Sequence, residues 1–182
     1  MSRHPKPKPK AVLLALMAAI APVGAAAQDC ALKLSEFSDA ATAYAGDVGT
    51  LSDRLTAMFA TFAVIEAASA AIPEACPAGL DDSRAAALAV DWEPLNARSD
   101  ALLDCGQFFN RRILADIGQA KSENDGQLIL RLGAVQERIF RIEETVLDAA
   151  TQATFAGLRA KALVAEHDAL ANRCQILGDI YD

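Results

Sequence analysis

The stretch from Leu34 to Ile72 constrains the fold more than any other part of this sequence. Apolar side chains recur along it at alternating steps of three and four residues, and Ser69 is the one polar member of the series. The series is Leu34, Phe37, Ala41, Tyr44, Val48, Leu51, Leu55, Met58, Phe62, Ile65, Ser69 and Ile72. This spacing places the side chains on one stripe of a helix, as in coiled coils and helical bundles. At about 1.5 Å per residue, one helix over this stretch would be about 58 Å long.

Two glycines lie within this stretch, and each costs about 1 kcal/mol relative to alanine in a helix. Gly46 and Gly49 both fall outside the stripe, and the stripe keeps its register across them. We therefore expect a single helix over residues 31–72 that ends before Pro73. A hairpin at residues 46–49 is the alternative, because the composition there also suits a turn.

A second heptad pattern runs from Leu88 to Ile113 and is interrupted by Pro94. We expect a short helix over residues 83–92 and a longer one from about Arg98, where Ser99 and Asp100 could cap the new start. One kinked helix is the alternative.

The last third of the chain predicts two more helices, over residues 128–149 and from Thr151 or Thr154 to about residue 178. The second of these carries a wide apolar stripe with many alanines. Short connectors between consecutive helices favour antiparallel packing. The predicted fold is all-α: an up-down bundle of four main helices with one long heptad-patterned first helix and two disulfides.

The first residues have the features of a signal peptide. Four basic residues precede an apolar segment over residues 11–21, which is too short to span a bilayer, and Ala25–Ala27 matches a cleavage site. We expect cleavage after Ala27, so that residues 28–182 form the single domain in the periplasm or the medium. An uncleaved membrane anchor is the alternative. Asp29, directly before Cys30, does not fit a lipoprotein site.

Removal of residues 1–27 changes the charge of the chain. The segment holds four of the 17 lysines and arginines and none of the 24 acidic residues, so the remaining 155 residues have a net charge of −11. This charge argues against nucleic acid or an anionic membrane as the partner. A transmembrane segment in the mature chain is not expected either, because Thr56, Thr61, Glu66 and Ser69 interrupt its most apolar stretch.

All four cysteines lie in the exported part, and an even number in an exported chain predicts disulfides. Their wide spacing does not match a zinc site or a redox pair. In the expected up-down topology, Cys76 and Cys105 lie at one end and Cys30 and Cys174 at the other. We therefore predict the pairs Cys76–Cys105 and Cys30–Cys174, among the three pairings that four cysteines allow.

Candidates for chemistry are few. His167 is the one histidine after residue 27, and Glu166 and Asp168 could orient it as a base, but a lone helical histidine favours a structural role. The Glu-x-x-His motif of di-metal bundles is missing, and Met58 lies in the first stripe, where a core role is favoured over haem ligation. Arg111 and Arg112 are expected to stabilise a helix C-terminus, with anion binding as the alternative. No cofactor or metal is expected.

Between Leu55 and Ile72 only Glu66 is charged. The side of the helix opposite the apolar stripe is also apolar there, where a solvated face would carry charges. Either other helices of the bundle cover this side, which we expect, or a partner protein or a second copy does. The candidate partner face consists of Ala60, Ala63, Val64, Ala67 and Ala71.

Residues 100–165 resemble a family of small, uncharacterised, mostly alphaproteobacterial and phage-associated helical proteins. The likeness rests on the segment Asp100–Cys105 with Phe108, similar to an "LLALCAEF"-like helix, and on Ala153–Ala162, similar to a "PATTLAGLRAKA"-like helix start. Here Gln152 replaces the proline of that pattern, and Phe155 replaces a threonine. The resemblance implies helical hairpins and no particular activity.

The predicted function is that of an exported, non-enzymatic helical bundle that acts through protein–protein contact in the cell envelope. A periplasmic bundle that binds a small ligand, as sensors do, is one alternative. An envelope enzyme with a site around His167 is the other.

Overall fold

The computed structural model describes residues 30–71 and 76–181. The predicted signal peptide, its cleavage site and Pro73 lie outside these residues. The described chain is helical with no strand, which confirms the all-α prediction. It consists of α1 (Leu34–Ala71), α2 (Leu80–Leu88), α3 (Glu93–Ser122) and α4 (Gly126–Tyr181).

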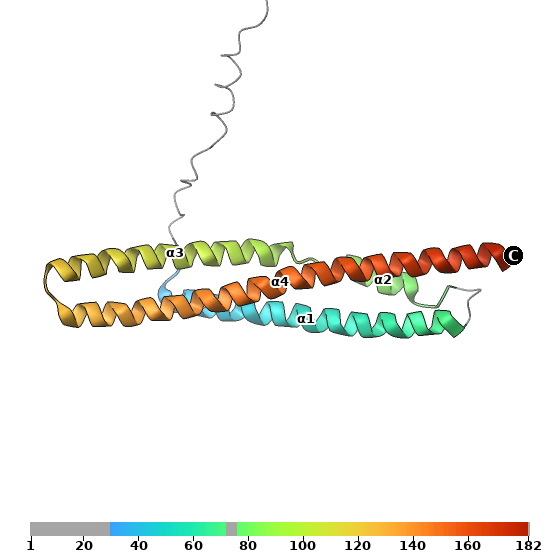
Figure 1. Ribbon diagram of the computed structural model, residues 1–182, viewed down its shortest axis with the longest axis horizontal. Helices are drawn as coiled ribbons and strands as arrows, with labels where there is room; N and C mark the ends of the chain where they lie inside the picture. Colours follow the sequence, from blue (N-terminus) through green and yellow to red (C-terminus); the bar gives the residue numbers. More distant parts are fainter. Residues whose placement is uncertain (1–29, 72–75, 182) are drawn as a thin grey trace, which may run out of the picture.

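The helices form a rod with α4 along its whole length (Figure 1). Helix α1 runs beside α4 in the same direction, while α2 and α3 run back in the opposite direction. Helix α4 contacts all three of the others. The turn between α3 and α4 lies at one end of the rod, beyond the start of α1, and α2 lies toward the other end.

Helix α1 forms as its heptad pattern predicts. Phe37, Tyr44, Val48 and Leu55 are fully buried, and the rest of the described stripe is buried or partly buried. The helix passes through Gly46 and Gly49 without a break, so the alternative hairpin does not form. The single long first helix is therefore confirmed, although it begins at Leu34 rather than at residue 31.

The second pattern is split, as expected, but the boundary differs. Helix α2 ends at Leu88, and α3 begins at Glu93, with Pro94 in its first turn rather than ahead of it. Proline is tolerated there because the first N–H groups of a helix have no partner within the helix. Ser99 does not cap a new helix, because its hydroxyl donates to the Asn96 carbonyl oxygen at 2.7 Å.

The break expected between residues 149 and 154 does not occur, and α4 continues through this segment. The hydroxyls of Thr151 and Thr154 donate to the carbonyl oxygens of Leu147 and Ala150 instead of capping a helix start. Small buried residues, among them Ala153 and Ala156, extend the seam without interruption. The last two expected helices are therefore one helix that runs in one direction.

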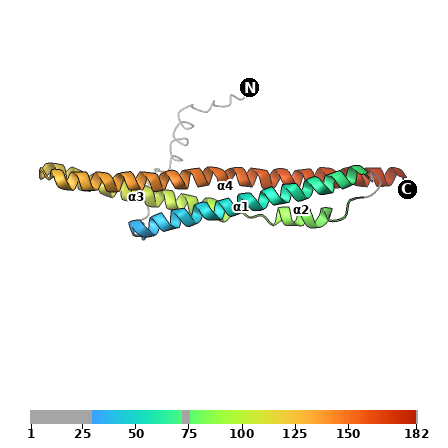
Figure 2. The same cartoon turned by 90° about the horizontal axis from the view of Figure 1, so that it is seen from below.

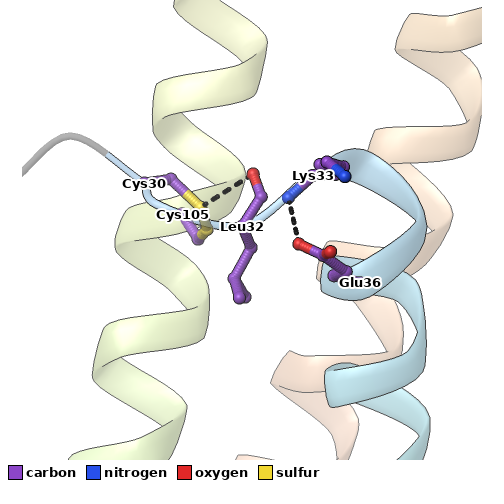
Figure 3. The surroundings of a disulfide bond; sticks show 5 residues. All are labelled: Cys30, Leu32, Lys33, Glu36 and Cys105. Atoms are coloured by element: carbon purple, nitrogen blue, oxygen red, sulfur yellow. Dashed lines mark hydrogen bonds between the residues drawn. A yellow bond between two sulfur atoms is a disulfide. The ribbon is translucent and has the colours of Figure 1, made fainter.

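The continuity of α4 changes the disulfides. The bonds are Cys30–Cys105, shown in Figure 3, and Cys76–Cys174, so the predicted pairing is wrong although all four cysteines form disulfides. A break in α4 would have returned Cys174 to the end where the domain begins. Without that break, Cys174 lies toward the far end of the rod and bonds Cys76, which precedes α2.

Candidate partner-binding face

The candidate face on α1 is exposed, which contradicts the expectation that the bundle covers it. Val64 is 71% exposed, and Ala60, Ala63 and Ala67 are exposed beside it, while the Ala71 side chain lies outside the described residues. We call Ala57, Ala60, Ala63, Val64 and Ala67 the outer face of α1. Figure 2 shows α2 on one side of the α1–α4 pair, with no described helix on the opposite side.

Helix α2 is held on its side by both apolar and polar contacts. Leu80 and Ala87 pack in a core cluster with Phe62 and Ile65 of α1. The Arg84 guanidinium forms an ion pair with Asp168 of α4, which raises the pKa of that arginine through their hydrogen bond. These contacts hold α2 on a side of the α1–α4 pair that does not cover the outer face of α1.

The second half of α4 carries an exposed apolar series that the sequence analysis missed. It follows the same spacing of three and four residues, on the opposite side of the helix from the buried seam. We call it the outer seam of α4: Phe155, Leu158, Ala162, Ala165, Ala169, Asn172 and Ile176, all of them exposed. The sequence signal for this series was the wide apolar stripe of the helix. In the structure that stripe divides into two, one buried and one exposed, and Leu158 belongs to the exposed one.

Two shallow grooves join the outer face of α1 to the outer seam of α4. The first, of about 350 Å³, is lined by Phe59, Ala63 and Glu66 of α1 and by Glu166, Ala169 and Arg173 of α4, among others. The second, of about 500 Å³, continues along Ala67, Ala70 and Leu177. The two apolar surfaces therefore lie side by side, with the charged residues Glu66, Glu166 and Arg173 between them.

The charged residues of this region leave it electrically balanced. Glu66 and Glu166 lie in the first groove with Arg173. Arg159 lies near one end, where its guanidinium covers the Phe59 ring at 5.3 Å and donates to the Thr56 hydroxyl at 3.2 Å. Two carboxylates and two guanidinium groups favour a protein surface as the occupant over a strongly charged ligand.

His167 lies away from this face and is completely buried. One ring nitrogen, Nδ1, lies 2.7 Å from the Leu163 carbonyl oxygen, and the other, Nε2, lies 2.8 Å from Ser83 Oγ on α2. The Phe62 ring centroid lies 4.4 Å from the imidazole centroid. Folding thus forms a Ser–His pair that the sequence did not predict, but the pair joins α2 to α4 in the packed interior.

The other candidates fall outside the face. Arg111 and Arg112 lie in the interior of α3, which continues to Ser122, so the expected role at a helix C-terminus is wrong. Met58 is partly buried against the core. Glu143 is partly buried and accepts a hydrogen bond from Asn110 at 2.8 Å. No group of three or more metal-ligand side chains occurs among the described residues.

A hollow of about 240 Å³ lies at the break between α2 and α3, lined by Leu88, Val90, Trp92 and Lys161 among others. The Lys161 ammonium lies 5.3 Å from the Trp92 ring centroid. The hollow is smaller than the roughly 300–1,000 Å³ of most small-molecule sites. Its small volume weighs against ligand binding at this hollow.

By length and composition alone, α1 between Leu34 and Ala70 could cross a membrane, and 22% of its most apolar window is buried. Core helices of soluble proteins also meet this test, and one stripe of α1 packs along the bundle. No family model, curated protein or solved structure matches the chain.

Proposed function

We propose that this is an exported, non-enzymatic helical protein that acts through protein–protein contact in the cell envelope. The observation that carries the proposal is the pair of neighbouring exposed apolar surfaces, the outer face of α1 and the outer seam of α4. Val64, Phe155, Leu158 and Ile176 are each more than half exposed in one part of the molecule. Contiguous exposed apolar surface of this kind marks interaction sites more often than single exposed side chains do.

Export fits the two disulfides, because such bonds persist in oxidising compartments such as the periplasm. The basic and apolar segments within residues 1–27 support export by a signal peptide. The net charge of −11 after residue 27 weighs against an anionic membrane surface as the partner.

The test is photo-crosslinking in cells that export the protein. A photoreactive amino acid replaces Val64 or Leu158 in the proposed region, and Leu130 serves as the control because it is 70% exposed at the other end of α4. We expect protein adducts at 64 and 158 and few at 130. The proposal fails if 64 and 158 give no protein adduct, or if they react with lipid alone.

A further inference from the structure

We propose that the outer seam of α4 binds the same seam of a second copy of this chain, in parallel and in register. This inference rests on the proposed function and names the partner. The seam spans residues 155–176, about 32 Å of helix at 1.5 Å per residue. It contains three heptads, the shortest length at which a coiled-coil pattern is informative.

The charges that flank the seam are complementary between two copies. On one flank lie Arg159, Glu166 and Arg173, and on the other lie Lys161, Asp168 and Gln175. In a parallel pair, a residue on the second flank faces the residue five positions later on the first flank of the partner. Lys161 then faces Glu166, Asp168 faces Arg173, and the two-fold axis repeats both contacts without placing like charges together.

These side chains remain available for contacts with a second copy. Lys161, Glu166 and Arg173 are exposed, although the Lys161 ammonium also lies over the Trp92 ring. The Asp168 side chain is 47% exposed although it pairs with Arg84. Exposed ion pairs contribute only about 0–1 kcal/mol each, so the charges select the register more than they add affinity. The affinity comes from burial of the apolar side chains.

Asn172 decides the orientation. An antiparallel pair about Ala162 and Ala165 would also match the charges, because Arg159 would face Glu166 and Lys161 would face Asp168. That arrangement places Asn172 against Phe155, and burying an amide without a polar partner is costly. In the parallel arrangement Asn172 faces Asn172 of the second copy, and Phe155, Leu158 and Ile176 each face their own equivalents. The paired amides of the parallel arrangement are polar partners for each other, and the antiparallel arrangement offers no such partner.

The first experiment measures self-association of the oxidised protein by analytical ultracentrifugation. We expect a reversible dimer whose dissociation constant rises at least about tenfold in Leu158→Glu, a loss of about 1.4 kcal/mol of binding free energy. Leu130→Glu is the matched control, because it adds the same charge to an exposed leucine of α4 outside the seam, and it should not change the constant. Equal effects in the two variants would overturn the proposal.

The second experiment determines the orientation. Ala165→Cys adds one thiol to a chain whose four native cysteines are paired. In the parallel dimer this thiol meets its equivalent and forms a disulfide between copies under mild oxidation, as close Cα positions allow. A bond that forms only when Ala162→Cys and Ala165→Cys proteins are mixed would support the antiparallel pair and overturn the parallel one.

The two proposals fail differently. A monomer at all concentrations, together with adducts to another protein at 64 and 158, would overturn self-association and leave the contact function standing. A monomer that binds neutral phospholipid vesicles through Leu158, and loses that binding in Leu158→Glu, would overturn both.

Discussion

The two halves of the rod share one buried seam but differ on the outside of α4. The hairpin half contains α3 and residues 126–151 of α4. From residue 137 to residue 151, the outer stripe of α4 consists of the exposed polar residues Glu137, Arg141, Glu144, Asp148 and Thr151, and Ala134 and Leu130 precede them on the same stripe. In the α2 half, which contains α2, residues 55–71 of α1 and residues 155–177 of α4, the same stripe continues as the outer seam. The change occurs within four residues of one unbroken helix.

The outside of α1 changes at the same level of the rod. Asp39 and Asp53 are exposed on the outside of its first part, whereas its outer face beyond Leu55 is apolar. The hydrogen bond between Arg159 and Thr56 shows that the two changes lie side by side. The hairpin half also exposes single large apolar side chains, among them Leu114, Leu130, Phe140 and Leu147, but the outer stripe of α4 is polar there from residue 137 to residue 151. Folding of α4 therefore does not require an apolar outer stripe. That difference is the physical reason to assign contact with a partner protein to the α2 half of the molecule.

The largest expected effect is the difference in stability between a substitution on the buried side of α1 and one on its exposed side. Leu55→Glu places an unpaired carboxylate at a fully buried position and should lower the free energy of unfolding by about 5 kcal/mol or more. Val64→Glu changes a residue that is 71% exposed and should keep the melting temperature of the monomer within a few degrees. Calorimetry of both variants measures the difference. Equal destabilisation would mean that the outer face of α1 belongs to the core.

The disulfides give the next largest effect, one in each half. They close loops with sequence separations of 75 and 98 residues, so replacing either pair by alanine should cost about 4–5 kcal/mol in the chain-entropy model.

Hydrogen exchange should distinguish the two variants by the helix whose amides lose protection. Loss of Cys76–Cys174 should expose the amides of α2, because a helix of nine residues has little stability alone. Loss of Cys30–Cys105 should expose the first turns of α1. Exchange that spreads equally in both variants would contradict this division.

Two glycines give the smallest expected effect. A Cβ at Gly106 would overlap the Glu143 side chain in the hairpin half, and a Cβ at Gly157 would lie 2.8 Å from Trp92 Nε1 in the α2 half. Gly157→Ala should cost about 1–3 kcal/mol through overpacking against the rigid indole ring. Gly106→Ala should cost less, because the end of the flexible Glu143 side chain can move aside. Only Gly157→Ala should shift the fluorescence of Trp92, the one tryptophan of the chain. Gly133→Ala, where a Cβ meets nothing within 4 Å, is the control and should not destabilise.

The sequence predicted what depends on local pattern. The heptad stripe of α1 is a local property, and so is the break near Pro94, although the exact start of α3 depended on the tolerance of a first turn for proline. The continuity of α4 was missed because Thr151 and Thr154 are good capping residues. Whether their hydroxyls cap a helix or bond within one depends on whether the seam on either side stays in contact with other helices.

The candidate site was harder to predict than the fold. The composition of residues 55–72 located the outer face of α1, but its exposure depends on where α2 packs, and Arg84 and Ser83 determine that through contacts with a distant part of α4. The outer seam of α4 was hidden because alanines fill both stripes of that helix. The disulfide pairing could not be predicted without the direction of α4.

The most direct test of the difference between the halves is hydroxyl-radical footprinting of the oxidised protein over a range of concentrations. We expect Phe155, Leu158 and Ile176 to become protected as the concentration rises, while Leu130 and Leu114, exposed in the hairpin half, react equally throughout. Protection of both sets together, or of the hairpin set alone, would contradict the assignment of contact to the α2 half.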